Sequence, residues 1–171
     1  MNTNSVRFFN EKNVKSVPDN SKIILAAWEV KNPSNLGKII RLGHNLGAEK
    51  ILFINDIPIY RKSKIKKTAG FSYDQATWEI LSKESFYSII NSSEHELVVL
   101  ETCEGAKNIY LEKLPQKTIL LAGSESHGLP SEVINLSNQK IYIPMPGDCK
   151  SMNISHALSV AAFEWYRQQT V

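Results

Sequence analysis

The sequence predicts a single-domain α/β fold with a mainly parallel sheet flanked by helices. Apolar runs of strand length alternate along the chain with stretches of helical periodicity. The strand-length runs are apolar at nearly every position, which is typical of strands buried on both faces. A strand, a helix and a second strand follow one another within about thirty residues between Ile23 and Ile54. This is the length of one βαβ unit, so we expect its strands to be parallel.

The first helix is predicted in most detail. It covers 35–46 and follows a loop at 31–34 that contains a proline. We expect Asn35 to cap the helix and Gly47 to end it. Its broad apolar face is formed by Leu36, Ile39, Ile40, Leu42 and Leu46.

The other elements follow from the same criteria. Residues 1–20 contain few apolar side chains and are predicted to form an N-terminal arm, loosely structured or folded into one short helix, ahead of a domain at 21–171. Strands are predicted at 23–28, 51–54, 77–81, 97–100, 118–122 and 140–143. Further helices are predicted at 84–91, at 131–136 with Ser131 as its cap, and at 153–168.

Composition narrows the class of protein. The 171 residues, 42% of them apolar, are enough for one domain with a full core. The net charge of +3 permits a nucleic-acid partner without requiring one. Cys103 and Cys149 form no CxxC pair, and no two histidines have metal-ligand spacing, so we expect no metal. We also expect a cytoplasmic protein with no membrane partner, because the chain shows neither a signal peptide nor a membrane-spanning stretch.

The first of three motifs is Asn35-x-Gly-x-x-x-Arg41, at the start of the first long helix. Arg41 lies about one and a half turns beyond Asn35. An arginine keeps its charge and carries five donors, so it suits phosphate binding. The alternative is an ordinary surface arginine on an amphipathic helix.

The second motif, Gly-Ser-Glu-Ser-His-Gly-Leu129, directly follows an apolar strand, which is where parallel sheets bind ligands. Gly123 and Gly128 allow close backbone approach, and Glu125 is able to accept hydrogen bonds. The motif is neither a dinucleotide-binding fingerprint nor a nucleophile elbow, which argues against a hydrolase that uses Ser126.

The third motif runs from Ile143 to Ala157, from the end of the last strand through a proline-containing loop into the last helix. Ser151 and Asn153 are its polar groups. Such a joint exposes backbone N–H groups and short polar side chains, as pockets for small molecules do. Taken alone, it is also compatible with an ordinary capped strand–loop–helix connection.

Together, Asn35-Leu-Gly-Lys-Ile-Ile-Arg41, Leu121-Ala-Gly-Ser-Glu-Ser-His-Gly-Leu129, and Ile143-Pro-Met145 with Ser151-Met-Asn-Ile-Ser155 resemble the three motifs of the SpoU (TrmH) family. These are RNA 2′-O-methyltransferases of the SPOUT superfamily, and the resemblance covers about 22–167. It implies a SPOUT fold with a deep C-terminal trefoil knot. It also implies S-adenosylmethionine as the cofactor and a homodimer with the first and last long helices near its interface.

The resemblance also implies roles for individual residues. Arg41 matches the catalytic arginine of the family, and the supporting polar positions are Asn35, Glu125, Ser151 and Asn153. By the same resemblance, the cofactor-binding residues are Glu101, Thr102, Gly123, Gly128, Ile143, Met145, Ser151 and Ile154.

The expected substrate is tRNA, because the chain is compact and its TAGFSY segment looks like that of small tRNA-modifying members. The wobble position and the D-loop guanosine both remain open, with a slight preference for the wobble position. The alternatives are a ribosomal-RNA methyltransferase of the same family and a non-catalytic RNA-binding protein that keeps the fold. The candidates for phosphate contacts are Lys12, Lys15, Lys31, Lys38, Arg61, Lys62, Lys64, Lys66 and Lys67.

Overall fold

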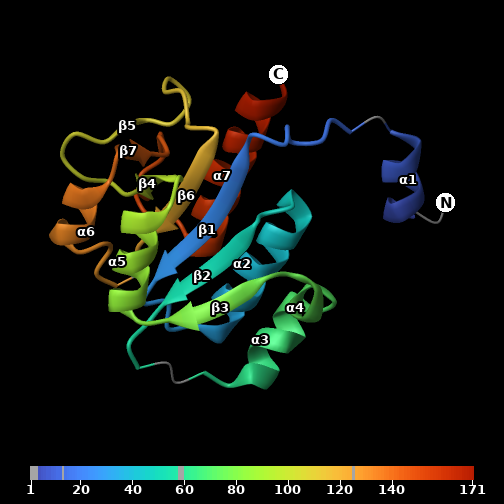
Figure 1. Ribbon diagram of the computed structural model, residues 1–171, viewed down its shortest axis with the longest axis horizontal. Coiled ribbons are helices and arrows are strands. Elements are labelled where there is room, and N and C mark those ends of the chain that lie inside the picture. Colours follow the sequence, from blue (N-terminus) through green and yellow to red (C-terminus); the bar gives the residue numbers. More distant parts are fainter. Residues whose placement is uncertain (1–3, 13, 58–59, 125) are drawn as a thin grey trace.

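The structure is a computed structural model that describes residues 4–12, 14–57, 60–124 and 126–171. In these ranges it contains one sheet of seven strands in the order β3-β2-β1-β6-β4-β7-β5 (Figure 1). Every recorded pairing is parallel, as the sequence predicts. The strands are β1 (Lys22–Trp28), β2 (Lys50–Ile54), β3 (Trp78–Leu81), β4 (Glu96–Leu100), β5 (Lys107–Asn108), β6 (Lys117–Ala122) and β7 (Gln139–Tyr142).

Helices cover both faces of this sheet. They are α1 (Ser5–Glu11), α2 (Pro33–Leu46), α3 (Lys62–Ala69), α4 (Ser72–Gln75), α5 (Lys83–Ser92), α6 (Ser131–Leu136) and α7 (Ile154–Thr170). Helices α2, α3 and α7 share one apolar cluster with the sheet, whereas α5 and α6 share another. The predicted α/β fold with flanking helices is therefore confirmed.

Strand β1 contributes to both clusters. Ile23 and Leu25 pack toward α2 and α7, and Ile24 and Ala26 pack toward α5 and α6. Successive side chains of a strand point to opposite faces, so a strand covered on both sides needs apolar residues throughout. This explains the continuous apolar run.

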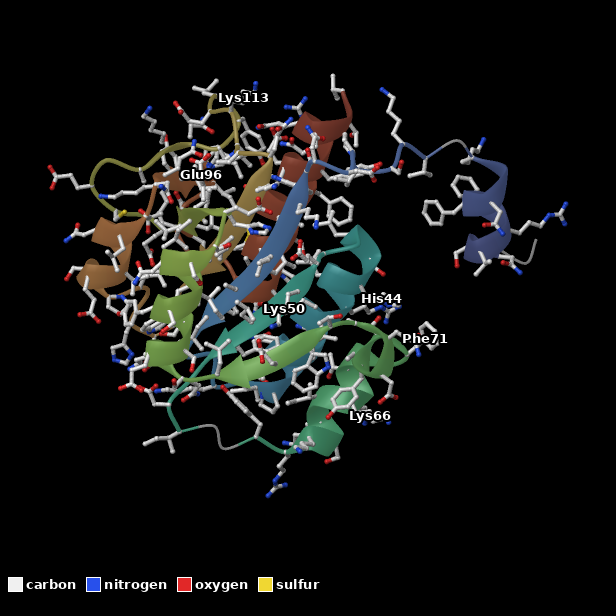
Figure 2. All side chains as sticks on the ribbon, in the orientation of Figure 1. His44, Lys50, Lys66, Phe71, Glu96 and Lys113 are labelled. Carbon is white, nitrogen blue, oxygen red and sulfur yellow. The ribbon has the colours of Figure 1, made fainter. Side chains whose placement is uncertain are left out.

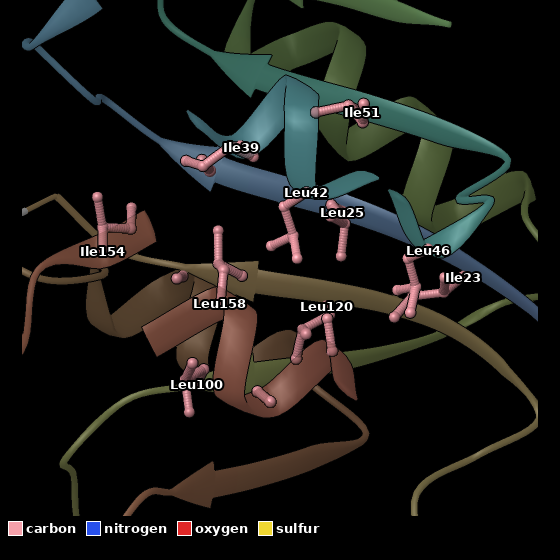
Figure 3. Close-up of a cluster of buried hydrophobic side chains, with 14 of the residues drawn as sticks. Ile23, Leu25, Ile39, Leu42, Leu46, Ile51, Leu100, Leu120, Ile154 and Leu158 are labelled. Carbon is pink, nitrogen blue, oxygen red and sulfur yellow. The ribbon is translucent and has the colours of Figure 1, made fainter. Parts of the chain in front are cut away.

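The face covered by α2 and α7 holds the larger cluster (Figure 3). Leu42 on α2 and Leu158 on α7 lie near Leu25 and Leu120 of the central strands. The apolar stripe of α7, which the sequence left open between a core and an interface, is buried in this core. Its members are Leu158, Ala161, Ala162 and Trp165.

Two predicted helix caps are wrong. Helix α2 begins at Pro33, and the side chain of Asn32, not of Asn35, accepts from the backbone N–H of Ser34 at 2.9 Å. Proline suits the first helical position because its missing N–H would have no partner there. Helix α6 starts at Ser131 itself, with no side-chain cap hydrogen bond from the preceding proline. The predicted end at Gly47 is confirmed, since its φ of 71° is left-handed.

The basic run at 61–67 forms most of α3, which packs closely against α2. At Gly37 of α2, an added Cβ would lie 2.7 Å from the backbone O of Ile65 and 2.9 Å from the backbone N of Ala69. Ile65 and Ala69 are buried, and the lysines of α3 face outward. Gly37 of the first motif therefore permits the close contact between α2 and α3.

The N-terminal segment extends from the body of the protein. Helix α1 lies apart from the sheet in Figure 1, and its Phe8 and Phe9 are exposed. The chain that follows is held by α7, since the Lys15 ammonium donates to the O of Thr170 at 2.8 Å and the Tyr166 hydroxyl donates to the O of Lys15. The boundary between arm and domain near residue 20 stays a prediction.

The strand order is also compatible with the predicted knot. Strand β7 is last in the chain, yet it lies between β4 and β5. The knot itself stays a prediction. Across the described ranges, no helix is both long and apolar enough to cross a membrane.

Candidate active site at the carboxyl ends of β4, β6 and β7

The three central strands of the C-terminal half end side by side. Strand β4 pairs with both β6 and β7, so the loops that leave these strands meet at one edge of the sheet. Between them lies an open cavity of about 240 Å³. Its lining includes residues from the ends of all three strands and from the start of α7, namely Leu100, Ala122, Tyr142 and Ile154.

All eight residues that the sequence assigned to cofactor binding line this one cavity. They come from three separate segments, 101–102, 123–128 and 143–154, and the fold brings them together. Their role in cofactor binding stays a prediction. The eight are Glu101, Thr102, Gly123, Gly128, Ile143, Met145, Ser151 and Ile154.

Glu101 holds the second motif in place. Its carboxylate accepts from the backbone N–H of Thr102 at 2.9 Å and from that of Leu129 at 3.0 Å. Gly128 has a φ of 64°, and an added Cβ would lie 2.7 Å from a Glu101 oxygen. The glycine is therefore required both by its backbone conformation and by the close approach of Glu101.

The third loop is more open. The Lys150 ammonium donates to the O of Met145 at 2.9 Å and closes the loop upon itself. Ser151 is exposed and lines the cavity. Hydrogen bonds with the backbone and then the side chain of Ser151 lower the pKa of the Cys149 thiol from its ordinary value.

A hydrogen bond joins the first motif to the third. Asn153 caps α7, since its Oδ1 accepts from the backbone N–H and the hydroxyl of Ser155 at 2.9 and 2.6 Å. The Nδ2 of Asn153 donates to Oδ1 of Asn35 at 3.3 Å. Asn35 is 2% exposed, in the first turn of α2. Asn35 therefore ties α2 to the start of α7.

Arg41 lies elsewhere. It is exposed on α2 and is not among the described residues that line the cavity. At 3.6 residues per turn it is about 120° around the helix from Asn35, which faces α7. Of the five predicted catalytic residues, Ser151 reaches the cavity and Asn35 and Asn153 brace it. Glu125 lies outside the described residues.

The sequence missed several residues that line the cavity: Leu100, Ala122, Ser124, Ser126, Tyr142, Lys150, Met152 and Ala157. Applying the strand-end rule to every predicted strand would have found those at the ends of β4, β6 and β7. The described residues contain no group of three or more His, Cys, Asp or Glu that could hold a metal ion.

Parallel strands with a ligand cavity at their carboxyl ends define an α/β protein that binds a small molecule in its loops. The SpoU rRNA Methylase family matches residues 22–163, and the chain belongs to this family.

The similar proteins include enzymes that act on tRNA and on ribosomal RNA. The tRNA (cytidine(34)-2′-O)-methyltransferase of Escherichia coli (strain K12) is 28% identical over 146 residues, which cover 84% of this chain and 92% of the relative. The enzyme of the same name from Photorhabdus asymbiotica is 31% identical with the same coverage. The 23S rRNA (guanosine-2′-O-)-methyltransferase RlmB of Xylella fastidiosa is 25% identical and covers 98% of this chain and 68% of the relative.

Solved structures show the same fold. One that describes the 2-OH methylation of C/U34 on tRNA has a TM-score of 0.76 and 27% identity, covering 88% of this chain and 98% of that one. The SpoU methyltransferase AviRb from Streptomyces viridochromogenes, in complex with AdoMet, has a TM-score of 0.78 at 21% identity. It covers 92% of this chain and 62% of that one, and at this identity the likeness shows the fold alone.

Proposed function

We propose that the protein is an S-adenosylmethionine-dependent RNA methyltransferase that adds a methyl group to a ribose 2′-hydroxyl of tRNA, at the wobble position. The observation that carries the proposal is the single cavity that gathers the loops of all the cofactor-binding segments predicted from the family. The tRNA enzymes that methylate cytidine 34 align over 92% of their length, whereas the ribosomal-RNA enzyme aligns over 68%. This difference favours tRNA over ribosomal RNA.

The cavity fits S-adenosylmethionine chemically. Leu100, Ile143 and Ile154 supply apolar surface for an adenine ring. Glu101 has acceptor sites beyond its two backbone partners, which suit ribose hydroxyls. Gly123 and Gly128 leave backbone polar groups uncovered. The cofactor, when bound, supplies an electrophilic methyl group.

The residues of the chain must orient the hydroxyl and manage its proton. We assign Arg41 to binding a substrate phosphate and to stabilising negative charge on the ribose oxygen. A guanidinium with a pKa above about 12 is a poor general base, so proton removal by Arg41 itself is disfavoured. Asn35, Ser151 and Asn153 take positioning roles, because they join α2 to the loop that borders the cavity.

The position of Arg41 supports a homodimer. Since Arg41 points away from Asn35 and does not border the cavity of its own chain, we infer that it serves the cavity of a second copy. Phe163, which is 48% exposed on α7, provides apolar surface for such a contact. We expect the reaction to take place in the cytoplasm, where the RNA substrate is found.

The first test is methyl transfer from labelled S-adenosylmethionine to unmodified tRNA and, separately, to ribosomal RNA, with mass spectrometry of the nucleosides. A 2′-O-methylated nucleoside from the wobble position is expected. A D-loop product would move the site within tRNA, and label in ribosomal RNA alone would refute the tRNA assignment. Cofactor binding without transfer to either RNA would favour the non-catalytic RNA-binding protein.

The role of Arg41 is tested by Arg41→Ala and Arg41→Lys. Both should lose methyl transfer and keep cofactor binding, because Lys retains the charge but not the planar fork. Mixing Arg41→Ala chains with Gly123→Ala chains should restore about a quarter of wild-type activity, since half of randomly formed dimers contain one intact shared site. No recovery, with mixed dimers shown to form, would place Arg41 and the cavity of the same chain in one site.

A further inference from the structure

Phe71 is an exposed aromatic residue on a rigid support. It lies between α3 and α4 and is 75% exposed. Gly70, with a φ of 61°, makes the turn before it. The two residues after it are anchored: Ser72 is buried and bonded to Nδ1 of His44 at 3.0 Å, and the ring of Tyr73 packs against Trp78 with 5.1 Å between centroids. The fold therefore holds the Phe71 ring in solvent.

Unpaired cations surround this ring on α3. Lys62, Lys64 and Lys67 are exposed, and no ion pair is recorded for them within the described parts of the chain. Lys66 pairs with Asp74 at 3.0 Å, which makes it a structural cation. The segment 61–67 carries five cations and no acid, so the surface is strongly positive.

The same surface continues to the first motif. His44 lies three residues beyond Arg41 on α2, on a neighbouring part of the same helix face. Its ring centroid is 5.8 Å from that of Phe71. Figure 2 shows His44, Phe71 and Lys66 along one edge of the molecule. Because α3 packs onto α2 at Gly37, the cations of α3 and Arg41 belong to neighbouring helices.

We propose that Phe71 and His44, with Lys62, Lys64 and Lys67, form a platform for the single-stranded RNA that flanks the methylated nucleotide. A flanking base stacks on Phe71, and the lysines bind backbone phosphates. The inference rests on the proposed function, and it adds how the substrate is held outside the reaction centre.

The chemistry of the surface favours RNA over a protein partner. An exposed aromatic ring beside unpaired lysines is the arrangement that binds single strands, since every base has a face for stacking and every nucleotide a phosphate. A docked apolar protein surface would need neighbouring apolar side chains, and around Phe71 the exposed neighbours on α3 are lysines. His44 lies about 14 Å along α2 from Asn35, so the stacked base is a neighbour of the target.

The stacking role is tested by fluorescence anisotropy of labelled, unmodified tRNA. Phe71→Ala should weaken binding by roughly 5- to 100-fold, and Phe71→Trp should preserve it. Tyr110→Ala removes an aromatic ring that is 51% exposed near β5 and should change nothing. In Phe71→Trp, the added tryptophan should be quenched when a single-stranded oligonucleotide binds.

The phosphate contacts are tested by salt dependence. The slope of log K against log salt should decrease by about 2 in the triple variant Lys62→Gln, Lys64→Gln and Lys67→Gln, at about 0.7 for each lost contact to a single strand. Lys113→Gln, at an exposed lysine on the opposite edge in Figure 2, should leave the slope unchanged.

Three results would overturn the platform: wild-type affinity in Phe71→Ala, an equal loss of affinity for a fully double-stranded RNA, or conversion of a dimer to a monomer. The last would show that Phe71 belongs to a contact between copies. RNA binding that depends on Phe71 without any methyl transfer would refute the proposed function and leave the platform standing. No binding of any RNA by the wild-type protein would refute both.

Discussion

Gly123 is the position at which one added methyl group tests the geometry of the cavity. In Gly123→Ala, the Cβ would lie 2.6 Å from the backbone N of Leu129 and 2.7 Å from the backbone O of Gly128. Backbone atoms cannot rotate aside as the end of a flexible side chain can. The loop between Gly123 and Leu129 must therefore open, and the wall of the cavity moves with it.

The expected cost follows from the size of this clash. Overpacking of such a contact costs about 1–3 kcal/mol of unfolding free energy. For a chain of this length, that corresponds to a decrease in Tm of roughly 2–12 °C. Because Gly123 and Gly128 both line the cavity, we also expect the affinity for S-adenosylmethionine to fall at least about tenfold, which equals about 1.4 kcal/mol.

Thermal unfolding and calorimetric titration with S-adenosylmethionine measure the two effects, at equal protein concentration because a dimer would make Tm depend on it. Gly147→Ala is the matched control. It adds the same methyl group in the third loop, where nothing lies within 4 Å and φ is not positive, so both quantities should stay at wild-type values. A Gly123→Ala protein with wild-type Tm and wild-type cofactor affinity would refute the described loop contact.

Two further predictions concern stability. Asn153→Ala should cost about 1 kcal/mol in urea unfolding because it removes the cap of α7, whereas Asn153→Asp keeps the cap and loses only the donor to Asn35; equal losses in both would contradict the capping role. Burial lowers the pKa of His95 from its usual 6.5 and outweighs the attraction of Glu49 at 3.8 Å, so the unfolded state binds the proton more readily. Stability should therefore fall as the pH drops below about 6.5, and His95→Gln should flatten that dependence in urea unfolding at pH 7 and pH 5.

Local patterns were enough to predict most of the sheet. The apolar runs that became β1, β2, β4 and β6 are buried on both faces, and such burial leaves a continuous apolar signature. The two-residue strand β5 was not predicted, because two residues carry no periodicity. The caps at Asn35 and Ser131 were wrong because a helix start depends on backbone geometry that several nearby polar residues can satisfy.

His95 illustrates a different limit. In the sequence it lies in a polar stretch, with serine and glutamate before it, that suggests a surface loop. The fold covers it, leaving it 9% exposed and lowering its pKa. Burial of one side chain depends on which distant segments pack over it, and no local pattern records that.

The order of the amino acids alone was sufficient to assign the family, the strand ends that carry the motifs and all eight cofactor-binding candidates. These follow from spacing and from the rule that ligands lie at the carboxyl ends of parallel strands. The tertiary structure decided how the motifs face one another. Asn35 turned out to be a buried partner of Asn153, and Arg41 to face away from the cavity of its own chain. Direction around a helix acquires meaning only when the neighbours of that helix are known, and the packing of α2 between the sheet, α3 and α7 supplies them.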